Sequence, residues 1–253
     1  MMLQGKVAII TGAASGMGRA MCLRFAQEGA GVAAVDVDRK GAEAVAKQVH
    51  EAGGEAMPFT CDVSQRDQVR EAVAATVRRF GKLHVLVNNA GIYLKDDYLL
   101  EDLTEETWDK VMGVNLKGAF YFCRFAIPEI ITCGGGAVVN IASTAALAGV
   151  DHPAYAASKG ALLNMTRAVA RQYAADNIRA NVICPGSTDT AMSRNAATFR
   201  QEATIPFPRM TSWMLPRAAR PEEIASVAAF LASEEASYIT AAVYPVDGGL
   251  TAI

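Results

Sequence analysis

The sequence has few cysteines, few histidines and no excess of charge of one sign. The cysteines are odd in number, scattered and never in a CxxC pair, which argues against a disulfide framework in a chain of 253 residues. The histidines form no HExxH or similar spacing, so we expect no metal centre. With a net charge of −2 and no long run of Lys or Arg, we expect no nucleic-acid partner. The cysteines are Cys22, Cys61, Cys123, Cys133 and Cys184, and the histidines are His50, His84 and His152.

From the sequence we also expect no signal peptide and no membrane-spanning helix. The first residues enter a short apolar run directly, without the cleavage region of a signal peptide. One charge-free stretch, Ile130 to Val150, contains three consecutive glycines together with Asn140, Ser143 and Thr144, which favours a strand with flanking loops over a membrane helix. With reduced thiols as the simplest interpretation of the cysteines, we predict a cytoplasmic protein with no membrane partner.

Strands and helices are predicted to alternate along the whole chain. Seven short runs rich in Val, Ile and Ala are typical of strands buried on both faces of a parallel sheet. Stretches of helical periodicity, such as 65–81 and 221–236, separate them. The alternation predicts a single doubly wound (Rossmann-type) α/β domain over 1–253, with about seven parallel strands and helices on both faces. The expected strands are 6–11, 31–37, 55–63, 83–90, 136–143, 178–186 and 241–249.

Residues 187–220 interrupt this alternation. The interval has irregular periodicity and is rich in Met, Phe, Pro and Trp, and a long irregular insert in a compact domain is more often functional than structural. Ligands of doubly wound folds bind beyond the carboxyl ends of the strands, so we interpret the insert as a substrate lid. Packing within a helical lid or at a subunit contact is an open alternative. The candidate lid residues are Met192, Phe199, Ile205, Phe207, Met210, Trp213, Met214 and Leu215.

A glycine-rich turn comes directly after the first predicted strand. In TGAASGMG, the glycines at positions 12, 16 and 18 have the spacing GxxxGxG rather than the common GxGxxG. Glycine permits a tight turn from strand to helix and lets backbone N–H groups approach a pyrophosphate at the helix N-terminus. Three glycines alone also fit a plain structural turn, so the motif predicts a dinucleotide only in combination with a ribose-binding group on the next strand.

The second predicted strand ends in a carboxylate, Asp36, eighteen residues beyond Gly18. A carboxylate at this strand end accepts hydrogen bonds from the adenosine ribose hydroxyls and repels a 2′-phosphate, which favours NAD over NADP. Arg39 and Lys40 leave NADP open, although Asp38 between them and the strand weakens that option. Asp36 also fits the N-cap of the next helix.

A phenol and an ammonium occupy one helical face in the run YAASK. Tyr155 and Lys159 are four positions apart, and residues at that spacing lie side by side on a helix. A free tyrosine has a pKa of about 10, too high for an efficient base near neutral pH, and a nearby ammonium favours the phenolate. The pair therefore predicts a phenol tuned for proton transfer. A solvated lysine on an alanine-rich helix is the alternative.

Taken together, the motifs resemble those of the classical short-chain dehydrogenases/reductases, in order and spacing, over essentially the whole chain. Each motif alone is weak, and the ordered set carries the resemblance. It implies an oxidoreductase that transfers a hydride between a nicotinamide cofactor and a secondary alcohol or ketone, and it implies a homotetramer. The motifs are NNAG at 88–91, VNLKG at 114–118, Ser143 in NIAST, YAASK at 155–159, PGSTDT at 185–190 and VDGG at 246–249.

The resemblance also implies roles for individual residues. Tyr155 would be the general base or acid, and Ser143 would orient the substrate oxygen. Lys159 would tune the phenol and hold the nicotinamide ribose, while Asn115 would hold a water linking Lys159 to solvent. The further cofactor contacts would be Gly12, Ser15, Gly16, Met17 and Gly18 at the pyrophosphate, Asp36 and Val37 at the adenosine ribose, Asp62 and Val63 at the adenine, Asn89, Ala90 and Gly91 at the ribose after the fourth strand, and Pro185, Gly186, Thr188 and Thr190 at the nicotinamide.

Apolar side chains around the expected site predict an alicyclic, aromatic or steroid-like secondary alcohol rather than a free sugar. Tyr93 follows the NNAG strand on the rim that Met192 would share, and His152, which the family motif does not require, is either a substrate contact or a loop residue. The stretch before Tyr155 lacks the Asn/Gln-rich loop of the family's acyl-carrier-protein reductases, which argues against that reaction. Leu94 and Tyr98 follow Tyr93 on the same rim.

Several alternatives stay open at this stage. An NADPH-dependent carbonyl reductase would share every catalytic residue, and a polyol or sugar dehydrogenase would differ only in the loops. A non-catalytic NAD-binding relative is disfavoured because Ser143, Tyr155 and Lys159 are all present. The arginines at positions 194, 200, 209 and 217 leave an anionic substrate open.

Overall fold

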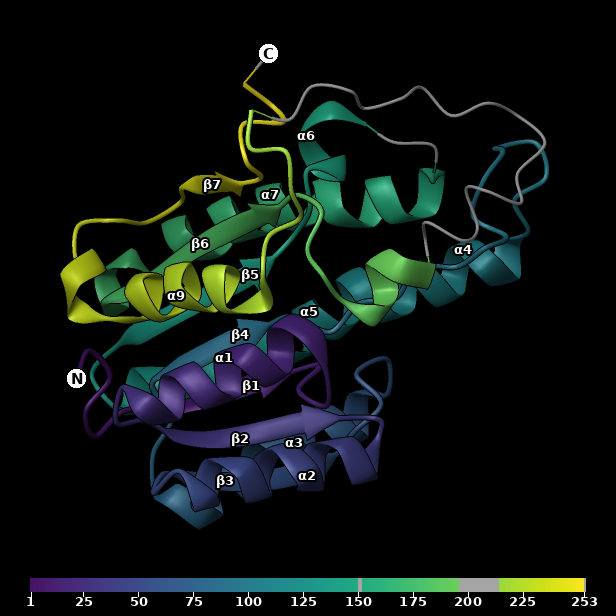
Figure 1. The fold of residues 1–253 in the computed structure, drawn as a ribbon. Coiled ribbons are helices and arrows are strands. Elements are labelled where there is room, and N and C mark those ends of the chain that lie inside the picture. The colour runs from purple at the N-terminus through teal and green to yellow at the C-terminus, as the bar shows by residue number, and fades with distance from the viewer. Residues whose placement is uncertain (150–151, 196–213, 253) are drawn as a thin grey trace.

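The computed structural model describes residues 1–149, 152–195 and 214–252. At its centre is a seven-stranded parallel sheet in the order β3-β2-β1-β4-β5-β6-β7, so strands from near both ends of the chain belong to one sheet (Figure 1). The predicted doubly wound parallel sheet is confirmed. The strands are β1 (Val7–Thr11), β2 (Gly31–Asp36), β3 (Glu55–Thr60), β4 (Val85–Asn88), β5 (Gly136–Ile141), β6 (Ile178–Pro185) and β7 (Val243–Val246).

Helices cover both faces of the sheet (Figure 1). One apolar core lies between the sheet and three helices, α1 (Gly16–Gln27), α2 (Arg39–Glu51) and α9 (Pro221–Ala232). The opposite core is formed with α3 (Arg66–Phe80), α5 (Gly118–Thr132) and α7 (Pro153–Gln172). The shorter elements are α4 (Glu105–Met112), the π-helix η1 (Gly113–Lys117), α6 (Ala145–Ala148) and the 3₁₀ turns η2 (Ala174–Asp176) and η3 (Glu234–Ala236).

The period of two along β1 explains why its residues form a doubly covered strand. Ala8 and Ile10 belong to the core with α1 and α9, whereas Val7 and Ile9 belong to the core with α3 and α5. All five residues of the strand are buried. Each such residue removes apolar surface from water on one face, so a continuous apolar run is stable only between two helical layers.

The observed strands stop short of their predicted ends. The predicted 55–63 ends at Thr60, 83–90 spans Val85–Asn88, and 241–249 spans Val243–Val246. Residues beyond the strand ends leave the ladder for loops at the carboxyl edge of the sheet, where ligands of this architecture bind. The predicted helix 221–236 is likewise interrupted at Ser233, whose backbone is extended and whose hydroxyl accepts from the N–H of Glu235.

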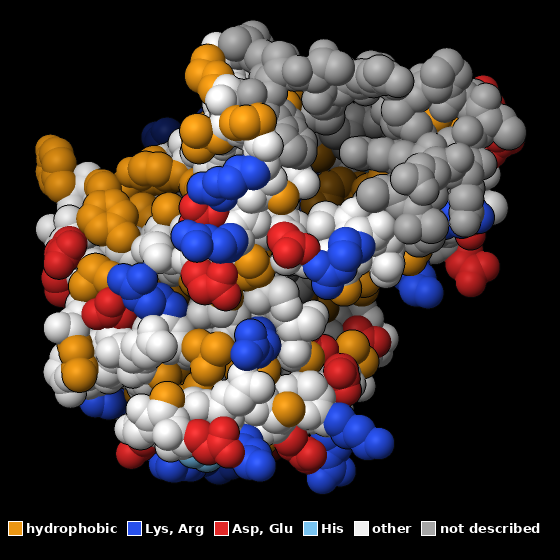
Figure 2. Space-filling view, in the orientation of Figure 1, with side chains coloured by type: hydrophobic (Ala, Val, Ile, Leu, Met, Phe, Trp, Pro, Cys, Tyr) orange, Lys and Arg blue, Asp and Glu red, His pale blue; other side chains and the backbone are white. Residues whose placement is uncertain are grey.

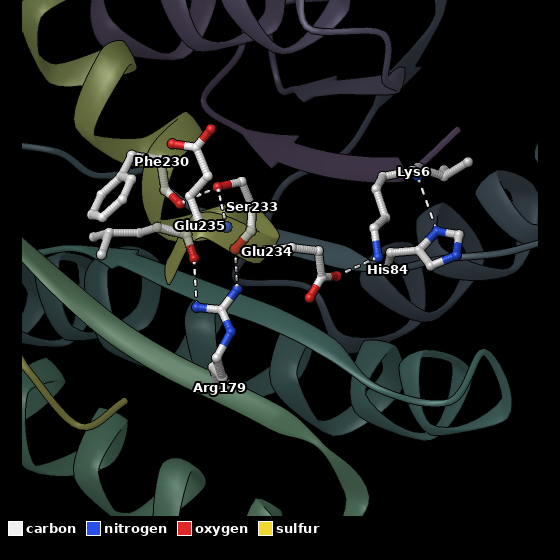
Figure 3. A network of polar contacts seen from close by, with 9 residues as sticks. Lys6, His84, Arg179, Phe230, Ser233, Glu234 and Glu235 are labelled. Carbon is white, nitrogen blue, oxygen red and sulfur yellow. Dashed lines mark hydrogen bonds and ion pairs between the residues drawn. The ribbon is translucent and has the colours of Figure 1, made fainter. Parts of the chain in front are cut away.

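The amino edge of the sheet is closed by a polar network (Figure 3). Arg179, the second residue of β6, donates to the carbonyl oxygens of Leu231 at 2.8 Å and Ser233 at 2.9 Å. Lys6, just before β1, pairs with Glu234 at 2.8 Å. These contacts join the end of α9 and the following turn to the sheet, so this edge is structural and the opposite edge carries the open loops.

The face formed by α1, α2 and α9 carries interspersed acidic and basic side chains (Figure 2). Arg24 pairs with Glu28 at 2.9 Å and Arg39 with Glu43 at 2.8 Å, both one helical turn apart. Such pairs neutralise the surface locally and contribute little to stability. Among the helices within the described ranges, none has the length and apolar character to cross a bilayer.

Candidate active site

A cleft of about 410 Å³ opens at the carboxyl ends of the strands. The structure brings together there most of the residues predicted to bind a cofactor, from five separate segments of the chain. Cys61, Ile92, Lys110, Val114 and Ala191 also line the cleft, and the sequence analysis did not name them. The predicted residues that line it are Gly12, Ser15, Gly16, Met17, Gly18, Asp36, Val37, Asp62, Val63, Asn89, Ala90, Gly91, Thr190 and Met192.

The glycine turn is packed so closely that Gly12 and Gly18 leave no room for a side chain. A Cβ at Gly18 would lie 1.9 Å from the carbonyl oxygen of Gly12, and Gly12 itself has a φ of +65°. The turn leads into α1, whose N-cap residue Ser15 makes no side-chain capping bond. The first N–H groups of a helix have no partner within the helix and favour an anion. The turn therefore offers a helix N-terminus at the cleft that fits a pyrophosphate.

Asp36 is tied to the glycine turn by its carboxylate. One oxygen accepts from the N–H of Ala14 at 2.9 Å, and the other accepts from the N–H of Asp38 at 2.9 Å. The alternative that Asp36 caps α2 is wrong, because Asp38 occupies the N-cap position and neither carboxylate caps that helix. The bonds hold a negative charge at the rim of the cleft.

Asn89 presents an unsatisfied acceptor beside the same turn. Its amide nitrogen donates to the carbonyl oxygens of Thr11 at 2.8 Å and Gly12 at 3.2 Å. Its Oδ1 is buried and has no hydrogen-bond partner among the described residues. A buried polar group without a partner costs free energy, which a donor such as a sugar hydroxyl would offset. The turn, the rim carboxylate and this acceptor together fit a dinucleotide.

Lys159 connects this cleft to Tyr155. The lysine side chain is 3% exposed, and its Nζ donates to the carbonyl oxygen of Ile141 at 2.8 Å. The same nitrogen lies 5.8 Å from the centre of the Tyr155 ring. A Cβ at Gly91, which lines the cleft, would lie 3.2 Å from it. The Lys159 ammonium therefore lies close to the cleft at Gly91 and close to the Tyr155 ring. The second contact is the one that the spacing of four along α7 predicts.

Burial shifts the pKa of both groups against their charged forms. It lowers the pKa of Lys159 to about 8, and it raises the pKa of Tyr155, which a hydrogen bond with Ser143 partly opposes. Lys159 is expected from the sequence to lower the pKa of the phenol, whereas in the folded protein loss of hydration is the largest influence and raises it. The ammonium donates to Ile141 and lies 5.8 Å from the ring centre.

Asn115 lies in the π-helix that continues α4, and a π-helical turn often marks a functional position. Its Oδ1 accepts from the N–H of Ile92 at 2.7 Å, and its amide donates to the carbonyl of Ile92 at 3.0 Å and to Ser158 at 3.1 Å. The Ser158 hydroxyl donates to the carbonyl of Tyr155 at 2.7 Å. The Asn115 side chain therefore connects the loop at Ile92 to Ser158 of α7. That Asn115 holds a water linking Lys159 to solvent stays a prediction.

The predicted substrate contacts divide between two places. Tyr93 packs edge-on against Tyr155 with ring centres 5.4 Å apart, and His152 bonds the Tyr93 hydroxyl with ring centres 4.2 Å apart. His152 is only 2% exposed. Met192, in contrast, lines the dinucleotide cleft. Tyr93 therefore adjoins the phenol directly, with His152 behind it.

Asp97 belongs to this group, and the sequence analysis did not find it. Its side chain is fully buried, and its carboxylate accepts from the N–H groups of Ala154 at 2.9 Å and Tyr155 at 2.8 Å. The two elements are more than fifty residues apart in the chain, so no local pattern reveals the contact.

The lid candidates Met214 and Leu215 contact the C-terminal segment. Gly249 has no room for a Cβ because Met214 Sδ would lie 2.7 Å from it, and the N–H of Leu215 donates to the carbonyl of Gly248 at 2.9 Å. These two lid candidates therefore pack on the C-terminal segment. The candidates Phe199, Ile205, Phe207, Met210 and Trp213 lie outside the described residues.

Two of the four arginines considered for an anionic substrate are paired with carboxylates. Arg194 forms an ion pair with Asp189, and Arg217 pairs with Glu223 at 2.8 Å. Positions 200 and 209 lie outside the described residues. The two described arginines therefore favour an anionic substrate less than the sequence suggests.

Of the four residues predicted at the nicotinamide, Thr190 lines the cleft and approaches Gly16. Pro185 pairs with Val246 of the last strand, and Thr188 bridges to Ala219. A Cβ at Gly186 would lie 2.8 Å from the Cα of Asp247, so this glycine is required by strand packing. Their predicted contacts with a nicotinamide stay predictions.

All five cysteines are free thiols. Within 1–149, 152–195 and 214–252, no group of three or more His, Cys, Asp or Glu side chains is arranged to hold a metal ion.

Comparison with known proteins supplies relatives that cover nearly the whole chain. A family model described as enoyl-(acyl carrier protein) reductase matches residues 12–251. A 3-oxoacyl-[acyl-carrier-protein] reductase of Thermotoga maritima is 41% identical over 99% of both chains. A cyclohexanol dehydrogenase of Acinetobacter sp. is 37% identical over 97% of this chain and 95% of the relative.

Further relatives with other named substrates, and a solved structure, are also similar to this chain. Dehydrogenases named for D-threitol, 3β-hydroxysteroids and meso-2,3-butanediol are 37%, 36% and 38% identical. A short-chain dehydrogenase of Mycobacterium paratuberculosis, solved bound to NAD, superposes with a TM-score of 0.94 at 31% identity, covering 100% of both chains. The relatives include several dehydrogenases named for alcohols with a CH–OH group.

Proposed function

Because the chain belongs to the short-chain dehydrogenase/reductase family, we propose that it transfers a hydride between NAD and a secondary alcohol or the corresponding ketone. The observation that carries the proposal is the placement of Tyr155, which adjoins Ser143 and lies beside the Lys159 ammonium, and that ammonium approaches the cleft at Gly91. A proton acceptor next to a dinucleotide site is what oxidation of an alcohol requires.

In alcohol oxidation, the Ser143 hydroxyl orients the substrate oxygen, and the Tyr155 phenolate takes its proton. The Lys159 ammonium, 5.8 Å from the ring centre, favours the phenolate during that step. A bound nicotinamide dinucleotide supplies the hydride chemistry and, when oxidised, further positive charge. In reduction, the neutral Tyr155 donates its proton to the carbonyl oxygen, and the raised pKa of the phenol keeps it protonated for that task.

The preference for NAD is proposed from the carboxylate of Asp36 at the cleft rim. Its two backbone hydrogen bonds fix the charge in place, so a 2′-phosphate would meet it without the carboxylate being able to turn away. The NAD-bound solved relative is consistent with this preference.

The Asp36→Asn variant tests the cofactor preference. We expect the ratio of kcat/KM for NAD to that for NADP to fall by about tenfold to a hundredfold, because the repulsion of a phosphate is removed while the shape of the side chain is kept. Initial rates with both cofactors measure the ratio. The matched control is Asp38→Asn, which removes a neighbouring exposed carboxylate. An equal change in both variants, or none in Asp36→Asn, would contradict the assignment.

An alicyclic or aromatic secondary alcohol is the substrate class that we propose. The phenol faces the edge of Tyr93, with His152 behind it, so an apolar ring is a better partner than a free sugar. The relative named cyclohexanol dehydrogenase supports this class. Those named for D-threitol and meso-2,3-butanediol keep small polyols and diols as an alternative.

Reduction of a 3-oxoacyl thioester is the second candidate function. The missing Asn/Gln-rich loop before Tyr155 disfavours it, whereas the relative at 41% identity carries that name. The two candidates share the proton donor and differ in the substrate that the loops admit.

Near-ultraviolet absorbance of reduced nicotinamide tests the proposal. The panel is cyclohexanol, a 3β-hydroxysteroid, 2,3-butanediol, threitol and an acetoacetyl thioester, each with NAD(H) and NADP(H). We expect NAD-dependent oxidation to be fastest with a cyclic alcohol. Turnover confined to the thioester would favour the second candidate, and NAD binding without any turnover would favour a non-catalytic relative.

A homotetramer is proposed from the family resemblance. The large apolar side chain of Phe120 on α5 is 45% exposed, which suits a helix that packs against another subunit. Sedimentation velocity measures the state, and a monomer at micromolar concentration would contradict it.

A further inference from the structure

The helix that carries Tyr155 begins without a cap of its own. The N-cap residue of α7, His152, makes no side-chain capping bond, and Pro153 at the first helical position has no N–H. The next two N–H groups belong to Ala154, which is fully buried, and to Tyr155. Water cannot reach the N–H of Ala154, and Tyr155 is half-buried, so these groups need an acceptor from elsewhere in the protein.

Asp97 supplies that acceptor from the segment between β4 and α4. One carboxylate oxygen accepts from Ala154 at 2.9 Å and the other from Tyr155 at 2.8 Å. Asp97 is 0% exposed, and its bond with Ala154 is buried, whereas the bond with Tyr155 is partly buried. A carboxylate at a helix N-terminus forms charge-assisted bonds and interacts favourably with the helix dipole. The bonds hold the backbone N–H of Tyr155 itself.

Asp97 also makes a second connection through its main chain. Its carbonyl oxygen bonds Nδ1 of His152, and because a carbonyl only accepts, Nδ1 carries the proton. The other ring nitrogen of His152 bonds the hydroxyl of Tyr93. The ring of Tyr93 stands edge-on to the Tyr155 ring at 5.4 Å. Asp97 thus bonds the backbone of Tyr155 through its carboxylate. Through His152 it also connects to Tyr93, whose ring lies beside the phenol.

We propose that Asp97 is a positioning residue that sets Tyr155 and Tyr93 relative to each other for proton transfer. The inference rests on the proposed function for its kinetic part. A shift of about 1 Å in a reacting group lowers a rate by about a hundredfold, and loss of the bonds in the first turn of α7 permits such a shift. Asp97 does not line the dinucleotide cleft, so we expect its loss to change cofactor binding little.

Two variants and a neighbouring control separate positioning from stability. We expect kcat to fall by about a hundredfold in Asp97→Ala and by about tenfold in Asp97→Asn, which keeps one carbonyl acceptor. The KM for NAD and the Kd for NADH, read from nicotinamide fluorescence, should stay within about twofold of the wild type, because Asp97 does not line the dinucleotide cleft. The control is Asp96→Asn, an exposed carboxylate one position earlier, for which no change is expected.

Amide hydrogen exchange gives a readout that does not depend on turnover. We expect exchange at the N–H groups of Ala154 and Tyr155 to accelerate by about tenfold or more in Asp97→Asn, with the core amides of β1 unchanged. Tyr93→Phe removes the bond between Tyr93 and His152 and leaves the Asp97 carboxylate in place, so it should raise the KM for the alcohol by about fivefold and leave those two amides protected.

The results that would overturn the proposal are distinct from those that would overturn the function. Unchanged exchange at both amides in Asp97→Asn, or wild-type kcat in folded Asp97→Ala, contradicts the positioning role. A parallel loss of kcat, cofactor affinity and folded fraction would reduce Asp97 to a structural residue and contradicts it too. A wild type that turns over nothing in the panel contradicts the proposed function, while the exchange experiment still decides whether Asp97 holds Tyr155.

Discussion

Replacing Tyr155 with Phe is expected to lower kcat for alcohol oxidation by about 10³-fold, because general acid–base groups contribute about 10²- to 10⁴-fold. The phenyl ring keeps the edge-on contact with Tyr93 and the packing of the phenol, so the fold is retained. What is lost is the proton acceptor and the hydrogen bond with Ser143. Steady-state rates across the alcohol panel measure the loss, and NADH fluorescence checks that the cofactor still binds.

The matched control for this variant lies on the same helix. Tyr173 forms the C-cap of α7 and packs in the core with α3 and α5, at the end of the helix opposite to Tyr155. We expect Tyr173→Phe to leave kcat unchanged within about twofold, since it touches no reacting group. A Tyr155→Phe enzyme that retains most of the wild-type kcat would show that another group takes the proton.

Replacing Lys159 with Met is expected to remove turnover and, at pH 7, to stabilise the fold. The ammonium is 3% exposed and has no carboxylate beside it among the described residues, and burial lowers its pKa from 10.5 to about 8. That shift corresponds to roughly 3 kcal/mol by which the folded state disfavours the ammonium. Methionine occupies similar space without the charge, although it gives up the bond to Ile141. The melting temperature should therefore rise by a few degrees.

The pH dependence of stability tests whether the buried Lys159 ammonium destabilises the fold. Between pH 8 and 10.5 the unfolded chain holds the Lys159 proton and the folded protein releases it, so this group makes stability rise with pH across that window. Below pH 8 both states are protonated, and the full cost of the buried ammonium is present. In Lys159→Met this contribution to the rise should disappear. Chemical denaturation at intervals from pH 7 to 10.5 measures it.

A surface lysine provides the comparison for this prediction. Lys117 is exposed at the end of the π-helix, so Lys117→Met should keep both the wild-type activity and the wild-type pH dependence of stability. If Lys159→Met is less stable than the wild type at pH 7, or keeps the rise between pH 8 and 10.5, the account of a costly buried ammonium is wrong. A group retained at a cost in stability is characteristic of a functional site.

The ordered motifs allowed most of the candidate site to be anticipated, and the reason is local geometry. The strand-to-helix turn at Gly12 to Gly18 and the spacing of Tyr155 and Lys159 on one helix follow from backbone conformation and the period of 3.6. The alternation of apolar strands and amphipathic helices likewise predicted the parallel sheet, because an apolar run of this kind must be covered on both faces. These features depend on residues that are neighbours in the sequence.

Only the tertiary structure decided the features that depend on distant segments. The hold of Asp97 on the start of α7 and the commitment of the Asp36 carboxylate to Ala14 join residues more than twenty positions apart. The raised pKa of Tyr155 reflects the hydration that the phenol loses on folding, which the charge of a neighbouring lysine did not reveal. Local patterns determine which elements form and which chemical groups they carry. Desolvation and long-range hydrogen bonds exist only once the elements have packed, and they set the position and protonation of those groups.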